Sequence, residues 1–208
     1  MTNSHRQGTL FIISAPSGAG KTSLVKELLK SLDGIVVSVS HTTRTQRPGE
    51  VDGRDYVFVS QEDFGEMVAE AAFLEHARVF DNHYGTAKAT VEAALQEGKD
   101  VILEIDWQGA RQIRGLMPAC QTIFVLPPSR DSLELRLSGR GQDDVETIRR
   151  RMADAISEMS HYGEYDYLII NDVFDQALDE LRAVVLASRL KMFHQSNAQH
   201  ALIEGLLG

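Results

Sequence analysis

The chain contains 208 residues, 43% of them hydrophobic and 25% charged, which is typical of an ordinary soluble globular protein of one domain. Its 30 acidic residues outnumber 21 basic ones, and the net charge of −9 argues against a sequence-independent nucleic-acid binder, which needs a broad cationic face. The sequence shows no signal peptide, no apolar run of the ~18 residues that a membrane span requires, and a single cysteine, Cys120, which cannot form an internal disulfide. We therefore expect a cytoplasmic protein whose partners are small phosphorylated molecules, with no nucleic acid and no membrane among them.

Short apolar runs followed by helical stretches recur along the chain. Five of these runs do not alternate with polar residues, a pattern typical of strands buried on both faces. Helical periodicity between several of them predicts βαβ units, and hence an α/β fold with a five-stranded parallel sheet flanked by helices. The predicted strands cover residues 9–14, 35–39, 101–106, 122–126 and 167–170, and the clearest helices cover 21–31 and 174–194. The tail, 195–208, is either a further short helix or frayed chain.

Two segments interrupt this pattern. Residues 40–88 contain a strand-like run at 56–59, and a capping box at Ser60 predicts a short helix through Glu70. We interpret this segment as a small α+β insertion at the carboxyl edge of the sheet, where open α/β sheets bind ligands. The other segment, about 130–151, is predicted to be irregular and is rich in arginine.

The connection between the first predicted strand and the first helix matches the phosphate-binding loop (P-loop) G-x-x-x-x-G-K-[ST], except that Ala15 replaces the first glycine. Gly18 and Gly20 let the backbone turn its N–H groups onto phosphate oxygens with no Cβ in the way. Lys21 would reach the β- and γ-phosphates, Thr22 would ligate Mg²⁺, and the helix amino end adds its partial positive charge. We expect a nucleotide site formed by Ala15, Pro16, Ser17, Gly18, Ala19, Gly20, Lys21 and Thr22.

Two carboxylates follow the third predicted strand. Glu104 and Asp106 end a buried strand, where acidic residues can orient water or a metal near phosphates. The alternative for Asp106 is that it caps the next helix. Asp106 and Gly109 also match the D-x-x-G of GTP-hydrolysing switches, but the sequence carries no Asn-Lys-x-Asp guanine motif late in the chain.

The insertion carries a cluster of side chains suited to a second phosphate. Arg44 and Arg47 lie three residues apart in a polar, turn-rich segment, Tyr56 follows, and Tyr84 comes later. Guanidinium groups bind a dianionic phosphate bidentately, and phenols donate hydrogen bonds to it. The alternative is that the arginines are only solvated surface.

With these residues in view, the sequence resembles the guanylate kinases over nearly its whole length, from about residue 10 to 193. The resemblance rests on the phosphate loop together with a set of short motifs that are far more specific than the loop alone. They are Ser38-Val39-Ser40, Thr42-Thr43-Arg44-Thr45, Arg47-Pro48-Gly49-Glu50, Asp55-Tyr56, Phe73-Leu74-Glu75, Tyr84-Gly85-Thr86, Glu104-Ile105-Asp106, Gly139-Arg140-Gly141 and Ile170-Asn171-Asp172.

The resemblance implies transfer of the γ-phosphoryl group of MgATP to GMP, and to dGMP, in purine nucleotide metabolism. It implies a P-loop NTPase-type core, a nucleoside-monophosphate-binding insertion and an arginine-rich lid over ATP. The core would comprise 1–39, 89–128 and 152–208, the GMP-binding insertion 40–88 and the lid 129–151.

The resemblance also assigns roles to single residues. It implies that the phosphate of GMP is bound by Arg44, Arg47, Tyr56 and Tyr84, and the guanine by Ser40, Glu75, Thr86 and Asp106. It also implies that the transferring phosphates are bound by Lys21, Arg136, Arg140 and Arg151, and that Asn171 lies near the adenine. A carboxylate at Glu75 suits guanine, because N1–H and the exocyclic amine are adjacent donors that it accepts side by side; from sequence alone, Glu75 is otherwise an exposed strand acid.

The acceptor in such a reaction is a phosphate that is largely dianionic at pH 7, so no general base is required. Two other functions compete with this one. The D-x-x-G match suggests a regulatory GTPase, and a non-catalytic guanylate-kinase-like module would bind protein partners. Such modules tend to lose the phosphate loop, which this chain keeps. The sequence gives no indication of oligomeric state.

Overall fold

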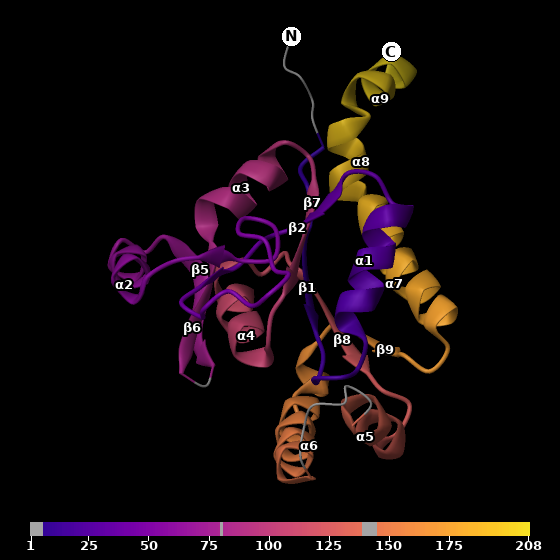
Figure 1. Cartoon of the computed structure of the whole chain (residues 1–208). Helices are drawn as coiled ribbons and strands as arrows, with labels where there is room; N and C mark the ends of the chain where they lie inside the picture. The colour runs from indigo at the N-terminus through magenta and orange to yellow at the C-terminus, as the bar shows by residue number, and fades with distance from the viewer. Residues whose placement is uncertain (1–5, 80, 139–144) are drawn as a thin grey trace.

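The structure is a computed structural model that describes residues 6–79, 81–138 and 145–208. Five parallel strands form its central sheet, in the order β2-β7-β1-β8-β9 (Figure 1). All five predicted strands are confirmed, with bounds that differ by at most two residues. The strands are β1 (Leu10–Ser14), β2 (Ile35–Val37), β7 (Asp100–Glu104), β8 (Gln121–Leu126) and β9 (Tyr167–Ile170).

Helices cover both faces of this sheet, which explains why its strands are apolar without alternation. In β1, Phe11 and Ile13 pack into the core formed with α1 and α7, whereas Leu10 and Ile12 pack into the core formed with α3 and α4. Figure 1 shows these two helix pairs on opposite sides of the sheet. Their bounds are α1 (Lys21–Ser31), α3 (Lys88–Gln96), α4 (Trp107–Leu116) and α7 (Phe174–Arg189).

The insertion forms a second sheet of four strands, in the order β4-β3-β6-β5. Its predicted helix is confirmed, because the Ser60 side chain and Asp63 form a reciprocal capping box at the start of α2 (Gln61–Ala69). The long hairpin β5–β6 was not predicted; β5 packs against α4 and so fixes the second sheet beside the first. The strands are β3 (His41–Thr42), β4 (Val57–Phe58), β5 (Phe73–Val79) and β6 (Asn82–Ala87).

The arginine-rich segment is helical where the structure describes it, so the prediction of an irregular segment is wrong there. Helices α5 (Arg130–Ser138) and α6 (Val145–Met159) lie beyond the carboxyl ends of the central strands (Figure 1). Leu133 and Leu137 of α5 pack with Ala155 of α6 in a small core of their own. A single 3-10 turn, η1 (Tyr162–Glu164), connects α6 to β9.

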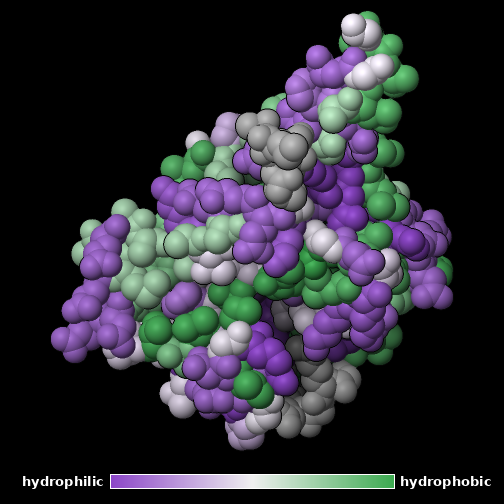
Figure 2. Space-filling view, turned by 90° about the horizontal axis from the view of Figure 1, so that it is seen from above, coloured by the Kyte–Doolittle hydropathy of each residue, from purple (hydrophilic) through white to green (hydrophobic). Residues whose placement is uncertain are grey.

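The helix predicted over 174–194 ends earlier than expected. Helix α7 ends at Arg189, and the backbone of Lys191 is not helical. The undecided tail forms two more helices, α8 (Met192–Ala198) and α9 (His200–Leu207). They project from the body of the molecule at the end opposite α5 and α6, and Figure 2 shows hydrophobic residues along this projection.

The amino end of the sheet is held by a fully buried carboxylate. Asp100, at the start of β7, accepts hydrogen bonds from the Thr9 backbone N–H at 2.8 Å and from Arg189 Nε at 2.8 Å. Arg6 pairs with the same carboxylate. This cluster joins the chain before β1, the start of β7 and the end of α7 at one point.

Candidate active site

The phosphate loop follows β1 and turns sharply into α1. Gly18 and Gly20 have φ angles of 88° and 94°, in the left-handed region that favours glycine. A Cβ on Gly20 would lie 2.3 Å from Nδ2 of Asn171, so this position has no room for a side chain. The predicted need for glycine at both positions is therefore met by backbone conformation, and at Gly20 by packing as well.

Two predicted ATP-side residues support the loop from behind. Asn171, which is buried at the end of β9, donates from Nδ2 to the Ala19 carbonyl at 2.7 Å. Arg136 of α5 donates to the Asn171 carbonyl at 3.0 Å and to the Ala19 carbonyl at 3.4 Å. Both side chains thus contact the loop backbone, which fixes the carbonyl that precedes Gly20.

A cleft of about 370 Å³ opens in front of the loop. It brings together the loop, the first turn of α1 and the two carboxylates Glu104 and Asp106 at the carboxyl end of β7, as the sequence predicted. Thr22 Oγ1 donates to Glu104 Oε2 at 3.1 Å, which joins the two motifs directly. The cleft is lined by Ala15, Pro16, Ser17, Gly18, Gly20, Lys21, Thr22, Ser23, Glu104, Ile105, Asp106 and Glu158.

The cleft brings one lysine and three carboxylates together. Desolvation lowers the pKa of Lys21, while the charges of Glu104, Glu158 and Asp106 act to raise it. Burial raises the pKa of Glu158, and the charge of Lys21 opposes that shift. Glu158 of α6 was not predicted, because nothing in its local sequence links it to the loop.

Asp106 both caps a helix and lines the cleft. It is the N-cap of α4, and its carboxylate accepts from the Gly109 backbone N–H at 3.0 Å, so the alternative that it caps the next helix is confirmed. It also lines the nucleotide cleft. The D-x-x-G match is therefore explained locally as a helix cap.

Glu75 lies in β5 and is buried, so the alternative of an exposed strand acid is wrong. Thr86 Oγ1 of β6 donates to its Oε1 at 2.6 Å. Burial raises the pKa of Glu75 to about 7, Asp106 adds to the rise, and hydrogen bonds from Thr86 oppose it. A Cβ on Gly109 would lie 2.9 Å from Glu75 Oε2. Glycine at this position thus lets β5 approach α4 and places Glu75 near the cleft.

The predicted phosphate cluster is assembled around Arg44. Its guanidinium donates to Glu50 Oε1 at 2.7 Å and lies over the Tyr56 ring, 5.3 Å from the centroid. The rings of Tyr56 and Tyr84 meet edge-on at 5.9 Å. The Arg44 side chain is only 12% exposed, so solvated surface is the wrong description of it, whereas Arg47 is exposed.

Glu50 had no predicted role in this cluster. Besides Arg44, it accepts a hydrogen bond from the Arg47 backbone N–H at 2.8 Å. Both bonds lower the pKa of Glu50, and the bond with Glu50 raises the pKa of Arg44. Glu50 therefore fixes the segment between the two predicted phosphate-binding arginines.

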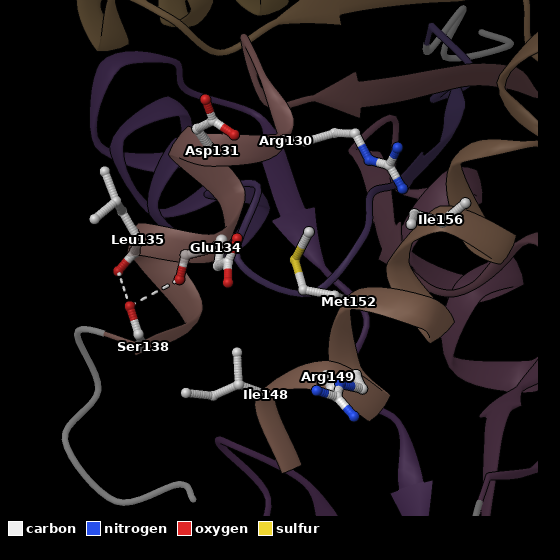
Figure 3. Close-up of a pocket in the computed structure, with 9 residues that line it drawn as sticks. All are labelled: Arg130, Asp131, Glu134, Leu135, Ser138, Ile148, Arg149, Met152 and Ile156. Atoms are coloured by element: carbon white, nitrogen blue, oxygen red, sulfur yellow. Dashed lines mark hydrogen bonds between the residues drawn. The ribbon is translucent and has the colours of Figure 1, made fainter. Parts of the chain in front are cut away.

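The remaining predicted residues are less closely connected to the cleft. Ser40 directly precedes β3 and is half-buried, as is Arg151 on α6. Arg140 lies outside the described residues. A separate cavity of about 880 Å³ lies between α5 and α6, and Figure 3 shows Met152 of α6 and Arg130 of α5 extending into the space between these helices. It shares no lining residue with the nucleotide cleft.

Comparison with known proteins identifies a family. The guanylate kinase family model matches residues 7–188. A guanylate kinase of Methylococcus capsulatus is 61% identical over 202 residues, which cover 97% of this chain and 99% of that protein. A guanylate kinase of Escherichia coli K12 is 57% identical over 203 residues, which cover 97% and 98%.

A solved structure agrees with these sequence matches. The crystal structure of guanylate kinase from Anaplasma phagocytophilum superposes with a TM-score of 0.75 at 31% identity, over 94% of this chain and 95% of that one. The family model covers most of the chain, and the full-length relatives share more than half of its residues. The chain therefore belongs to the guanylate kinase family.

Proposed function

We propose that the chain transfers the γ-phosphoryl group of ATP to GMP, and to dGMP, and so forms ADP and the corresponding diphosphate. The observation that carries this proposal is the position of Asp106, which lines the phosphate-loop cleft and accepts a hydrogen bond from the N–H of Gly109, the residue against which the buried Glu75 carboxylate packs. Two sites, one for a triphosphate and one for a purine with paired donors, are thereby adjacent. Transfer between two bound substrates needs this adjacency.

We assign the three predicted segments accordingly. Residues 1–39, 89–128 and 152–208 form the nucleotide-binding core, 40–88 the GMP-binding insertion and 129–151 the lid. The separate four-stranded sheet supports the insertion boundary, and the small core shared by α5 and α6 supports a lid that extends into α6.

On the ATP side, the loop from Ala15 to Thr22 wraps the phosphates with backbone N–H groups at the amino end of α1. Lys21 supplies positive charge inside the cleft, where electrostatic interactions are stronger than in water. Asn171 holds the loop through its bond to Ala19, and the same position lies near the adenine in our assignment.

Mg²⁺ fits the donors at the cleft. The Thr22 hydroxyl and the Glu104 carboxylate are hard oxygen donors within hydrogen-bond distance of each other, and Mg²⁺ in phosphoryl-transfer enzymes is held by one or two such groups together with substrate phosphates. No group of three or more metal-ligating His, Cys, Asp or Glu side chains occurs in the part of the chain that the structure describes. When bound, the ion neutralises charge on the phosphate oxygens.

On the GMP side, Arg44, Arg47, Tyr56 and Tyr84 bind the acceptor phosphate. The ion pair with Glu50 orients Arg44 before the substrate arrives, so less side-chain freedom is lost on binding. The hydroxyl groups of Tyr56 and Tyr84 then donate to phosphate oxygens that the arginine does not reach.

Ser40, Glu75, Thr86 and Asp106 bind the guanine. Ionised Glu75 accepts from N1–H and from the exocyclic amine, and the Thr86 hydroxyl donates to Glu75 Oε1 and so orients the carboxylate. Adenine presents an acceptor at N1 and would leave the buried carboxylate unpaired, which is costly. Specificity for guanine follows from this mismatch.

The reaction itself needs charge neutralisation and in-line alignment more than proton transfer. The acceptor phosphate is already a nucleophile. Lys21 and the lid residues Arg136, Arg140 and Arg151 neutralise the transferring group, while Arg44 holds the acceptor. Closure of the lid and the insertion over the cleft excludes water and suppresses hydrolysis of ATP.

The competing functions fit less well. In a regulatory GTPase the D-x-x-G segment would serve as a switch, whereas here it caps α4. A non-catalytic binding module would not need the phosphate loop, which is intact and lines a cleft. No helix in the described residues has the length and apolar character needed to cross a membrane.

The test is ADP formation from MgATP with GMP, dGMP, AMP, UMP and CMP each offered separately, beside a control without acceptor. Turnover with GMP and dGMP alone is expected. Equal ADP release with and without acceptor would identify an NTPase and contradict the acceptor site assigned here.

A further inference from the structure

Glu158 lines the nucleotide cleft but belongs to none of the motifs that define it. It lies in the last turn of α6, whereas the other lining residues come from the phosphate loop, the start of α1 and residues 104–106 at the carboxyl end of β7. A carboxylate thus contributes to the wall of a space that must accept the phosphates of a nucleotide. Anion against anion is unfavourable, so this position calls for an explanation.

The carboxylate interacts with groups that bind phosphate. It lines the cleft together with Ser17 and Lys21. Burial raises its pKa, while the Ser17 backbone N–H and the charge of Lys21 favour the ionised form. The charges of Asp106 and Asp154 act in the opposite direction. In the ligand-free chain, therefore, the Glu158 carboxylate lies in the same cleft as the loop and Lys21, where both favour its negative charge.

Packing holds this part of α6 against the loop. Ala155, one turn before Glu158, packs with Leu133 and Leu137 of α5. These leucines in turn close over Gly18, where a Cβ would lie 3.1 and 3.2 Å from their side-chain carbons. A continuous apolar contact therefore runs from the loop through α5 to the turn that carries Glu158.

A second contact fixes the chain just after Glu158. The ring of His161 stacks on Trp107 of α4, with centroids 3.8 Å apart and planes 11° from parallel. Glu164 pairs with both His161 and Arg111 at 2.7 Å. Because Trp107 directly follows Asp106, both ends of this segment are tied to walls of the cleft.

We propose that Glu158 is an internal anion for the phosphate loop: its carboxylate occupies the Ser17 N–H and faces Lys21 until the phosphates of ATP displace it. The inference rests on the proposed function only in taking ATP as the nucleotide of this cleft. A tethered group competes at high effective concentration. If the carboxylate occupies the loop in about 90% of ligand-free molecules, the apparent affinity for ATP is about tenfold lower than the intrinsic affinity.

The experiment measures equilibrium binding of ATP and of inorganic tripolyphosphate to the full chain, without GMP and at one fixed Mg²⁺ concentration. The variant is Glu158→Gln, which keeps the shape and removes the charge. Asp154→Asn is the matched control, because it removes the same charge from an exposed position one turn earlier on α6.

We expect Glu158→Gln to lower the Kd of both ligands about tenfold, and Asp154→Asn to change either Kd less than twofold. Glu158→Asp, whose shorter side chain retracts the carboxylate, should change both Kd values in the same direction by less. Unchanged or weaker binding in Glu158→Gln would overturn the proposal, as would equal tightening in Asp154→Asn. Tighter binding of ATP in a chain that phosphorylates no monophosphate would leave this inference intact and contradict the proposed function instead.

Discussion

The two ends of the central sheet use buried charge in opposite ways. At the amino end, the Asp100 carboxylate is fully buried and is paired with two arginines and a backbone N–H. At the carboxyl end, Lys21 meets three carboxylates, and its pKa and that of Glu158 are shifted against their charged forms. At the amino end both carboxylate oxygens of Asp100 have partners within the chain, whereas at the carboxyl end a substrate would pair the charges better.

This difference separates stability from chemistry along a single set of strands. Removing a partner from a complete buried cluster leaves an uncompensated charge, which is strongly destabilising. Removing a charge from the carboxyl end relieves desolvation and costs the fold little, but it removes stabilisation of the reacting phosphates. Substitutions at the two ends should therefore affect different measurements.

The largest effect is expected at the carboxyl end. Lys21→Ala should lower kcat by about 10³-fold, in line with the loss of a preorganised electrostatic group, and should change the free energy of unfolding by less than ~1 kcal/mol. Steady-state ADP formation and urea unfolding measure the two quantities. Lys30→Ala, in an exposed pair on the same helix, is the control, and a near-normal rate in Lys21→Ala would contradict the assigned role.

Asp100→Asn should reverse that pattern at the amino end. We expect a loss of roughly 3 kcal/mol in the free energy of unfolding, with kcat near normal at temperatures where the variant is folded. Glu97→Gln breaks only an exposed pair with Lys99 and should cost less than ~1 kcal/mol. If Asp100→Asn unfolds like the control, the amino-end cluster is not the anchor inferred here.

Glu75→Gln tests the guanine site, and its expected effect is smaller than that of Lys21→Ala. The Glu75 carboxylate is buried, and no ion pair to it is found among the described residues. The amide presents a donor toward guanine donors, so kcat/KM for GMP should fall about 10²-fold, while the Kd for ATP stays the same. Glu66→Gln, on the exposed side of α2, serves as the control. If ATP binding weakened by the same factor, the two sites would not be separate.

The pH dependence of Glu75 sharpens the same test. Because burial raises its pKa from 4.5 to about 7, the folded chain holds a proton that the unfolded chain has released between these values. The free energy of unfolding of the wild type should therefore fall, relative to Glu75→Gln, as the pH rises from 4.5 to about 7. Conversely, kcat/KM for GMP should fall as the pH drops below about 7, because Glu75 is then protonated. The pH profile of Glu75→Gln should lack this fall. Parallel curves for both proteins would contradict the assignment.

The smallest effect is expected at Asn171. Asn171→Ala leaves the Ala19 carbonyl with only the long bond from Arg136, so KM for ATP should rise about tenfold. If the side chain acts through the loop alone, KM for other nucleoside triphosphates rises equally. A rise for ATP only would mean that Asn171 recognises adenine directly.

The sequence was most informative where a residue's role is local. Strands buried on both faces have continuous apolar runs, and α1 and the capping box of α2 carry their own boundary signals, so these elements were predicted within a residue or two. The hairpin β5–β6 escaped prediction because β5 mixes His76, Arg78 and Glu75 with apolar residues and is buried only at its start. Helix α5 buries just Leu133 and Leu137 among charged neighbours, which leaves little periodic signal.

The same distinction applies to the site. Lys21 and Thr22 follow from a contiguous motif, whereas the contact of Asn171 with Ala19 joins residues far apart in the chain. The position of Glu158 depends on how α5 and α6 pack, which no local pattern encodes. Glu50 lies close in sequence to Arg44, but its role is visible only once the turn between them is folded.

The contact between Gly20 and Asn171 also constrains how such a chain can change over generations. A larger residue at position 20 would collide with the Asn171 amide, and a smaller residue at position 171 would leave the Ala19 carbonyl without its short hydrogen bond. Neither position can be altered alone without loss, and the positive φ of Gly20 blocks the joint change. These two residues, which come after the first and last strands of the central sheet in chain order, therefore restrict each other.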